Sequence, residues 1–428
     1  MATENPRVWF KSISLENVRS FGEKQTINFT DKGGNAARWN VILGNNGTGK
    51  TTVLKGLALI LGWIETDLKN FLRNIEQEAK TSVTIEKHDL STATLQQDYK
   101  WFVRKGYIED GQVLSQRNFN QSQYFQGAEP AYAMHVRAYG ANRRIAESGI
   151  SFPSSNSLLS LFDENVAVIN AEEWLIQTDY IDYKNTQAEK RFYLVRSMLL
   201  ELFRHEASDI FISVESRTPK VFFKTHYGDV RLHELSLGYK TLIAWMVDFA
   251  KGLLDRYPDS PDPLAEPAVC LVDEIDLHLH PKFQRTIIKF LTETFPNTQF
   301  IVTAHSPLIV IAAEERPLDA NIILLKREGD QTVVVNDPVD VTNWSVDQVL
   351  NSDLFGHVPS RSEPLTKLRT ERDTLLAKSK LTKKDNARLV ELDEKIGFIP
   401  FGQDQAEIKA ETIIQQLADV LRKQQQAQ

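Results

Sequence analysis

The sequence predicts an α/β fold that contains an antiparallel subsheet, and three observations lead to this fold class. Residues 7–30 alternate apolar and polar side chains, as expected for a β-hairpin. A glycine-rich segment, 44-GNNGTGKT-51, separates an apolar strand at 39–43 from a helix at about 50–62. From residue 209 onward, strand-like and helix-like segments alternate up to 333–337, which is typical of a sheet covered by helices.

Length and composition are those of a globular protein. With 428 residues, 42% of them hydrophobic, the chain can form two or three domains and bury a sizeable core. The formal net charge of -7 argues against a protein that coats nucleic acid over its whole surface, although a local basic patch is compatible with it. The single cysteine, Cys270, excludes an internal disulfide framework and a cysteine-based zinc site, and fits a reducing compartment.

No segment of the sequence predicts contact with a membrane. The longest apolar run, 57-LALILGWI-64, is too short to span a bilayer. The first ten residues, MATENPRVWF, do not have the pattern of a signal peptide. We therefore expect a cytoplasmic protein.

The middle of the chain is predicted to add strands and a helical lobe to a head domain that spans residues 1–335. The clearest amphipathic helix lies at 186–203, inside a helical lobe that we place at about 145–207. A second long helix is expected at about 236–256. Further strands are expected at 81–88, 100–108, 132–140, 209–216 and 220–226.

Beyond residue 340 the composition changes, and we assign residues 336–428 to a C-terminal helical region. Residues 361–395 are dense in charged side chains, with leucines at helical spacings and a turn signal at 380–386, which predicts a charged helical hairpin. A last helix is expected to present an apolar side made of Ile413, Leu417, Val420 and Leu421.

The segment 44-GNNGTGKT-51 matches the P-loop pattern G-x-x-x-x-G-K-[ST] in the strand-loop-helix context that this pattern requires. Its glycines allow backbone N–H groups to close around phosphate oxygens, and the helix N-terminus adds its positive end. Lys50 is expected to reach the β- and γ-phosphates of ATP, and the Thr51 hydroxyl to bind Mg²⁺. The predicted nucleotide-binding residues are Gly44, Asn45, Asn46, Gly47, Thr48, Gly49, Lys50, Thr51 and Thr52.

The segment 271-LVDEIDLHLHP-281 places two acids at the end of a buried strand, where open α/β sheets bind their ligands. We expect Asp273 to hold Mg²⁺ as the Walker B acid, and Glu274 to act as the general base that activates the attacking water. His278 and His280 are two residues apart and lack further ligands for a tetrahedral metal site, so we expect them to shape an interface instead. Pro281 predicts the first turn of the next helix.

Two further segments are informative mainly in combination with the P-loop and the segment 271–281. In 235-LSLGYK-240, Ser236 is a natural N-cap and Gly238 permits close backbone approach, so this helix start can bind phosphate. In 299-QFIVTAHSPLIV-310, His305 follows a buried strand and can hydrogen-bond a γ-phosphate or the attacking water. Each is also compatible with a purely structural role, as a capped helix start and a strand-end histidine.

In the order GNNGTGKT, LSLGY, LVDEID and TAHS, these motifs resemble those of ABC-type ATPase heads, over about residues 8–335. The segment 15-LENVRSFGE-23 narrows the resemblance to the SMC/RecF-like branch. The DEIDLHLHP loop and 139-YGANRR-144 favour its OLD-like side, to which many ATPases of prokaryotic anti-phage systems are similar. The resemblance implies an ABC-type head with an antiparallel β-subdomain, a helical lobe and a C-terminal helical appendage.

The resemblance also implies a dimer, or a higher homo-oligomer, that closes around ATP. Ser236 and Gly238 of one subunit would contact the γ-phosphate bound by Lys50 of the other. Arg19, in the hairpin motif, would contact phosphate as well.

Three departures from the family pattern affect this interpretation. The acid that ends the D-loop of transporter-type members is absent, and His280 stands there, as in OLD-like members. No Gln occurs at the expected Q-loop near 139–144, so Asn142 or Arg143 is expected to replace it. No long coiled-coil arm separates the P-loop from the signature, so a spanning DNA tether is not expected.

OLD nucleases have a TOPRIM domain after the ATPase, but residues 336–428 contain no comparable set of acids. The resemblance therefore implies a separate effector nuclease, as in anti-phage systems of the Septu and PARIS types. Our leading interpretation is an ATPase that acts as sensor and scaffold for such a nuclease.

A second interpretation is a RecF-like repair ATPase that clamps duplex DNA. It rests on the NVRSF hairpin and on a basic run that is also typical of a solvated helix face: Lys378, Lys380, Lys383, Lys384 and Arg388. A transporter ATPase is a third interpretation, disfavoured by the same hairpin and by the helical C-terminal region.

Overall fold

The chain folds into two compact units, Met1–Gly356 and His357–Gln428. The computed structural model describes residues 5–60, 73, 79–88, 94–103, 108–109, 112–113, 134–146, 157–184, 189–214, 218–315, 320–358, 362–378, 381–396, 409 and 413–414. The first unit continues past residue 335 because Val341, Val349 and Leu354 are buried in its core. In these residues, no helix combines the length and the apolar character needed to cross a membrane.

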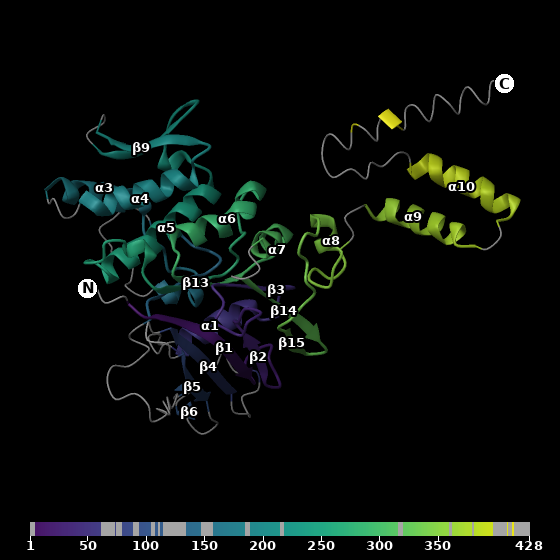
Figure 1. Ribbon diagram of the computed structural model, residues 1–428, viewed down its shortest axis with the longest axis horizontal. Coiled ribbons are helices and arrows are strands. Elements are labelled where there is room, and N and C mark those ends of the chain that lie inside the picture. The colour runs from purple at the N-terminus through teal and green to yellow at the C-terminus, as the bar shows by residue number, and fades with distance from the viewer. Residues whose placement is uncertain are drawn as a thin grey trace. The chain divides into compact units, whose positions relative to one another are not determined.

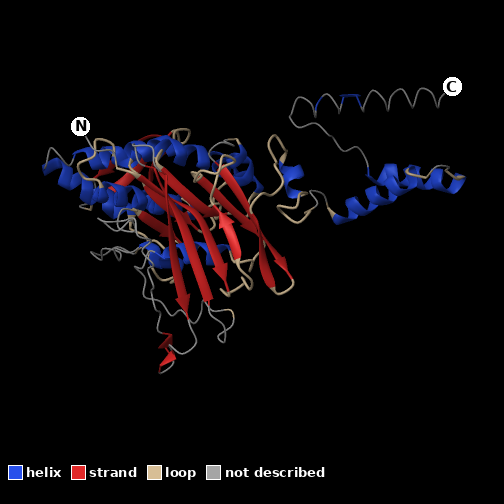
Figure 2. Ribbon diagram, turned by 60° about the horizontal axis from the view of Figure 1, so that its bottom comes forward, coloured by secondary structure: helices blue, strands red, loops and turns tan. Residues whose placement is uncertain are grey.

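A six-stranded sheet with the order β15-β14-β3-β13-β12-β8 forms the centre of the first unit. Figure 2 shows strands in red beside the helices in blue. Adjacent strands pair in parallel, except that β14 and β15 form an antiparallel pair. The carboxyl ends of the parallel strands therefore lie along one edge, where α/β sheets bind their ligands. The strands are β3 (Trp39–Gly44), β8 (Val136–Tyr139), β12 (Ala268–Val272), β13 (Thr298–Thr303), β14 (Ala320–Glu328) and β15 (Gln331–Val335).

Two hydrophobic cores cover the two faces of this sheet. Cys270 and Val272 of β12 belong to one core, and Val269 and Leu271 belong to the other. This alternation follows from the two-residue period of a strand and explains why β12 is apolar throughout. The first core includes α5 (Leu237–Arg256), α6 (Pro281–Thr294) and α7 (Pro307–Glu314), and the second includes α1 (Lys50–Ile60), on the opposite side of the sheet (Figure 1).

The predicted antiparallel subsheet is confirmed as four strands in the order β2-β1-β4-β5. Its members are β1 (Arg7–Glu16), β2 (Gln25–Asn28), β4 (Ala79–His88) and β5 (Thr94–Val103). A buried glutamine of the central sheet, Gln299, fastens β1: its amide accepts from Phe10 N–H at 2.8 Å and donates to Phe10 O at 2.8 Å. A separate short hairpin consists of β6 (Ile108–Glu109) and β7 (Gln112–Val113).

Helices occur where the helical lobe is predicted, and a small antiparallel sheet follows them. The helical elements are η2 (Ser157–Leu161), α3 (Ala171–Lys184) and α4 (Glu189–Leu202), and the sheet consists of β9 (Ala207–Ser213), β10 (Lys220–Thr225) and β11 (Gly228–Arg231). The helices α3 and α4 contact α5, which confirms the long helix expected at 236–256. The described part of the unit also contains three short elements: η3 (Leu232–Glu234), η4 (Pro263–Ala265) and α8 (Val346–Leu350).

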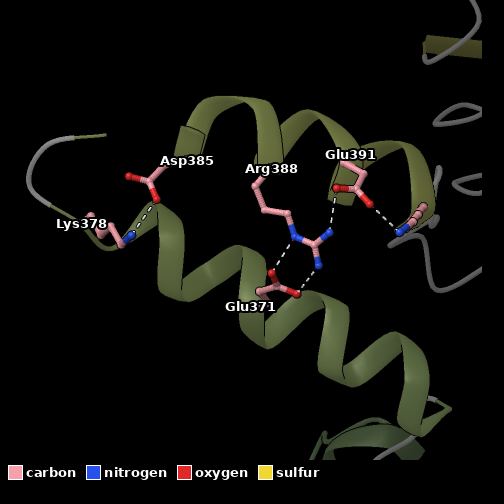
Figure 3. Close-up of polar contacts among 6 residues, drawn as sticks. Glu371, Lys378, Asp385, Arg388 and Glu391 are labelled. Carbon is pink, nitrogen blue, oxygen red and sulfur yellow. Dashed lines mark hydrogen bonds and ion pairs between the residues drawn. The ribbon is translucent and has the colours of Figure 1, made fainter. Parts of the chain in front are cut away.

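The second unit contains the predicted charged hairpin, formed by α9 (Glu363–Leu376) and α10 (Lys383–Ile396). Figure 3 shows its ion pairs: Arg388 donates to both oxygens of Glu371 at 2.7 and 2.9 Å, and Lys378 donates to Asp385 at 2.7 Å. Among the described residues of the hairpin, Leu392 is fully buried. The last helix predicted around Ile413, Leu417, Val420 and Leu421 lies mostly outside the described residues.

We expect Leu392→Ala to loosen the hairpin, because truncating a buried leucine costs roughly 2–5 kcal/mol. The control is Val390→Ala on the same helix, whose side chain is 60% exposed. Hydrogen exchange of the full chain should show faster exchange across α9 and α10 in the Leu392 variant only. Equal exchange in the two variants would contradict a packing role for Leu392.

Candidate functional site

The P-loop runs from Gly44, at the end of β3, to the first turn of α1. Gly49 has a φ of +93°, and a Cβ there would lie 2.4 Å from Ser20 Oγ and 2.8 Å from the Phe21 ring, so only glycine fits. Lys50 Nζ lies within the loop and donates to Gly44 O at 2.7 Å and to Asn45 O at 3.2 Å. Burial lowers the pKa of Lys50, and nearby carboxylates, Asp273 first among them, oppose that effect.

The turn after β1 and the strand β15 contact the P-loop from outside. Ser20 Oγ donates to Thr48 O at 3.3 Å, and Thr332 Oγ1 donates to the same carbonyl at 2.9 Å. Arg19, the predicted phosphate contact, is exposed in the turn before Ser20 and has a φ of +47°. Burial lowers the pKa of Lys55, in the first helix, and the positive charge of Arg19 lowers it further. Arg19 is thus the chain neighbour of Ser20, the residue that contacts the P-loop backbone.

The buried carboxylate of Asp273 connects the P-loop to the centre of the sheet. Its Oδ2 accepts from Thr51 Oγ1 at 2.8 Å, and its Oδ1 accepts from Thr303 Oγ1 at 2.6 Å. Thr303 can bridge in this way because β13 lies between β3 and β12. The contact between Thr51 and Asp273 joins a hydroxyl and a carboxylate, the hard oxygen ligands that Mg²⁺ uses at phosphate sites, so the residues fit this ion.

Glu274 follows Asp273 in a left-handed backbone conformation, with a φ of +49°. This conformation is uncommon for a residue other than glycine and occurs at functional sites when the surroundings stabilise it. One stabilising contact is the Glu274 N–H, which donates to Thr303 Oγ1 at 2.7 Å. The chain therefore turns sharply at the sheet edge, where Asp273 is buried and Glu274 is half-buried.

His305 lies at the same sheet edge, directly after β13 and Ala304. It is exposed, and its backbone N–H donates to the Asp276 carboxylate at 3.0 Å, which ties the end of β13 to the loop after Glu274. Ser306 is the N-cap of the next helix, because its Oγ accepts from Leu308 N–H at 3.1 Å at the start of α7.

The signature segment forms the exposed start of α5. Ser236 is the N-cap, and its side chain accepts from Tyr239 N–H at 3.5 Å, at the outer limit of a hydrogen bond. Ser236 is exposed, and the adjacent Leu237 is 58% exposed. Gly238 packs against the loop that follows Glu274 in the same chain: a Cβ at Gly238 would lie 2.2 Å from His278 O.

The two loop histidines have structural roles in the described contacts. His278 has a φ of +63° and presents its carbonyl to Gly238, while His280 caps α6 by accepting from Lys282 N–H at 3.3 Å. The helix begins at Pro281, as predicted. In the part of the chain that the structure describes, no group of three or more His, Cys, Asp or Glu residues could hold a metal ion.

Two residues of the site are not assigned by the sequence motifs. Thr303 is the last residue of β13, and its hydroxyl donates to Asp273. This contact requires β13 to lie next to β12, and the motif TAHS alone does not reveal that strand order. For the missing Gln, the sequence offers Asn142 and Arg143 as alternatives. The structure places Arg143 against the Walker B backbone, donating to Asp273 O and Glu274 O, whereas Asn142 is exposed and approaches Glu164 O at 3.5 Å.

Relatives of this chain include a retron probable ATPase and two Septu proteins. A "Retron Vc95 probable ATPase" of Vibrio cholerae serotype O1 biovar El Tor is 26% identical over 379 residues, which is 72% of each chain. A "Septu protein PtuA" of Bacillus thuringiensis is 24% identical over 338 residues, 76% of this chain and 80% of that protein. A PtuA of Bacillus mycoides is 22% identical over 352 residues, and the match spans only 45% of its length.

Solved structures that align with this chain include an SMC head bound to the C-terminal winged-helix domain of ScpA. The alignment covers 76% of this chain and 97% of that chain, with a TM-score of 0.45 and 15% sequence identity. The recombination mediator RecF has a TM-score of 0.43 and 14% identity over 78% of this chain and 100% of that chain. Residues 9–321 match the model of the RecF/RecN/SMC N terminal domain. This match covers most of the chain, which therefore belongs to the RecF/RecN/SMC family.

Proposed function

We propose that this protein is an SMC-like ATPase that closes as a dimer around ATP and controls a separate effector nuclease in anti-phage defence. The observation that carries the ATPase proposal is the chain of hydrogen bonds from Thr51 through Asp273 to Thr303 and on to the Glu274 N–H, beside the P-loop. It connects a metal-binding pair to a candidate base at one sheet edge.

Each group in this chain has a chemical role. Thr51 and Asp273 would hold Mg²⁺, which, when bound, neutralises charge on the phosphates of ATP. Lys50 provides a positive charge beside the P-loop glycines, where the phosphates bind. Glu274 orients and deprotonates the attacking water, and His305 lies at the same edge to contact the γ-phosphate or that water.

Exposure of the signature supports a composite site between two subunits. Ser236 and Leu237 are exposed, and free N–H groups at a helix start bind anions. Gly238 is packed against the His278 loop of its own chain, so the outer side of the α5 start is available to a second molecule. Ser236 would then contact the γ-phosphate held by Lys50 of its partner subunit.

Control of a nuclease is what the resemblance to anti-phage systems of the Septu type implies, and two relatives of this chain are Septu PtuA proteins. Affinity purification from the native host, followed by mass spectrometry, tests this part of the proposal. A nuclease encoded beside this gene should co-purify. Recovery of replication or recombination proteins in its place would count against it.

The structure weakens one motivation for the DNA-clamp interpretation. In the basic run, Lys378 and Arg388 are paired with Asp385, Glu371 and Glu391, and the pKa of Arg388 is raised by the two glutamates (Figure 3). Charges neutralised in this way bind phosphate less well. Salt-dependent DNA affinity of the purified protein with ATP would revive the interpretation.

Glu274→Gln should bind ATP normally but hydrolyse it at least about 100-fold more slowly, because the water loses its base while the P-loop contacts persist. Glu328→Gln, at the exposed end of β14, is the control and should keep wild-type activity. Phosphate release and nucleotide titration measure the two effects. Wild-type turnover in Glu274→Gln would show that another group is the base.

Lys50→Ala should weaken nucleotide binding itself by roughly tenfold to a hundredfold, since hydrogen bonds to a charged group contribute about 1.5–3 kcal/mol. The control is Lys289→Ala on α6, whose side chain is 59% exposed. Calorimetric titration with ATP measures the affinity. Equal affinities for the two variants would exclude Lys50 as a phosphate ligand.

Ser236→Arg should leave ATP binding to the monomer intact but block the ATP-dependent dimer, because the bulky side chain lies at the contact with the partner's nucleotide. Light scattering with ATP should therefore show a monomer for this variant, although nucleotide titration shows that it still binds ATP. A mixture with Lys50→Ala provides one intact composite site per heterodimer, and partial ATPase recovery is expected if one site can act alone. Full activity of the Ser236→Arg homodimer would rule out a signature that acts across subunits.

A further inference from the structure

Residues 140–146 connect the end of β8 to the segment that leads into α3. At the β8 end, Asp273 N–H donates to Tyr139 O at 2.8 Å. At the other end, Ala146 N–H donates to Val168 O at 3.0 Å and Val168 N–H donates to Arg144 O at 2.8 Å. This segment is therefore attached both to the strand that bears the catalytic acids and to the helical lobe.

Arg143 lies in the middle of this segment with an unusual environment. Its side chain is buried, at 4% exposure, and its backbone φ is +35°. The guanidinium donates to three main-chain carbonyls: Gly140 O at 3.2 Å, Asp273 O and Glu274 O. Burial lowers the pKa of Arg143 to about 10, and the charges of Asp273, Asp276 and Glu274 oppose that effect.

We infer that Arg143 is a positioning residue for hydrolysis, acting by holding Glu274 in the orientation that a general base requires. This inference rests on the proposed function, because it assumes that Glu274 is the base. The orientation of a peptide carbonyl is set by the φ and ψ angles beside it, so one guanidinium that binds the carbonyls of Asp273 and Glu274 restrains the backbone of Glu274. Its φ of +49° needs such restraint.

Arginine suits this position better than lysine. Its planar guanidinium offers five N–H donors in a fixed geometry, so it can bind several carbonyls at once, whereas the ammonium of lysine is a compact point charge on a flexible stem. Lysine at position 143 would keep a positive charge near the acids but would not fix both carbonyls. The substitution Arg143→Lys thus tests positioning separately from charge.

A purely structural role makes different predictions from a positioning role. If Arg143 only satisfied buried carbonyls, its replacement would lower stability, and nucleotide affinity and turnover would fall together. If it positions Glu274, kcat should fall while nucleotide affinity stays the same, because the P-loop contacts of Lys50 do not involve Arg143. A misplacement of about 1 Å at a reacting group costs about 100-fold in rate.

The experiment compares Arg143→Lys with Arg144→Lys in the full chain. Arg144 is the adjacent exposed arginine and provides a matched control. For Arg143→Lys we expect a drop in kcat of at least about tenfold, an affinity for a fluorescent ATP analogue within about threefold of wild type, and an intact melting transition. Arg144→Lys should match wild type in all three. Arg143→Gln, which retains an amide donor, is the second variant and should show the same loss of kcat if the lysine variant does not fold.

A double variant identifies the residue through which Arg143 acts. If it acts through Glu274, then Arg143→Lys combined with Glu274→Gln should hydrolyse ATP at the residual rate of Glu274→Gln alone. Losses that multiply, or a wild-type kcat in Arg143→Lys, would overturn the inference while leaving Glu274 as the base. Wild-type hydrolysis by Glu274→Gln itself would overturn the proposed base, and this inference with it.

Discussion

The parallel pairing of β13 between β3 and β12 is the constraint on which the site depends. It aligns Val302 with Val272 and Thr303 with Ile42, so the strand end at Thr303 lies between the P-loop and Asp273. From there its hydroxyl donates to Asp273 and accepts from the Glu274 N–H. A shift of one residue in this register would turn Thr303 to the other face of the sheet and separate the P-loop from the acids.

Packing on both faces of the sheet holds β13 in that register. Phe300 stacks on Trp39 of β3 with ring centroids 4.4 Å apart, and the Trp39 indole donates to Thr292 of α6 at 2.8 Å. On the opposite face, the amide of Gln299 bonds to both backbone groups of Phe10 in the antiparallel subsheet. A slipped strand would leave these buried polar groups unpaired, at a cost of about 1–3 kcal/mol each. Packing far from the nucleotide therefore determines the geometry at the sheet edge.

Much of this arrangement can be predicted from the sequence, because it depends on local chemistry. The P-loop, the apolar β12, the caps at Ser236 and Ser306 and the start of α6 at Pro281 each follow from a few adjacent residues. The bridging role of Thr303 cannot be predicted in this way, because it depends on strand order. The sequence leaves Asn142 and Arg143 as alternatives, and only the path of the chain after β8 places one of them against the Walker B backbone.

Glu274 lies in a loop whose shape is determined from two sides. Arg143 binds the carbonyls of Asp273 and Glu274 at the start of the loop, and Gly238 packs against the carbonyl of His278 further along it. Glu274 and His278, both with positive φ, lie at these two contacts. Gly238 belongs to the exposed start of α5, so a second molecule that binds there, as proposed, would contact the helix end that packs against the same loop as Arg143. The exposed start of α5 is thus connected to the loop of the candidate base through the contact between Gly238 and the His278 carbonyl.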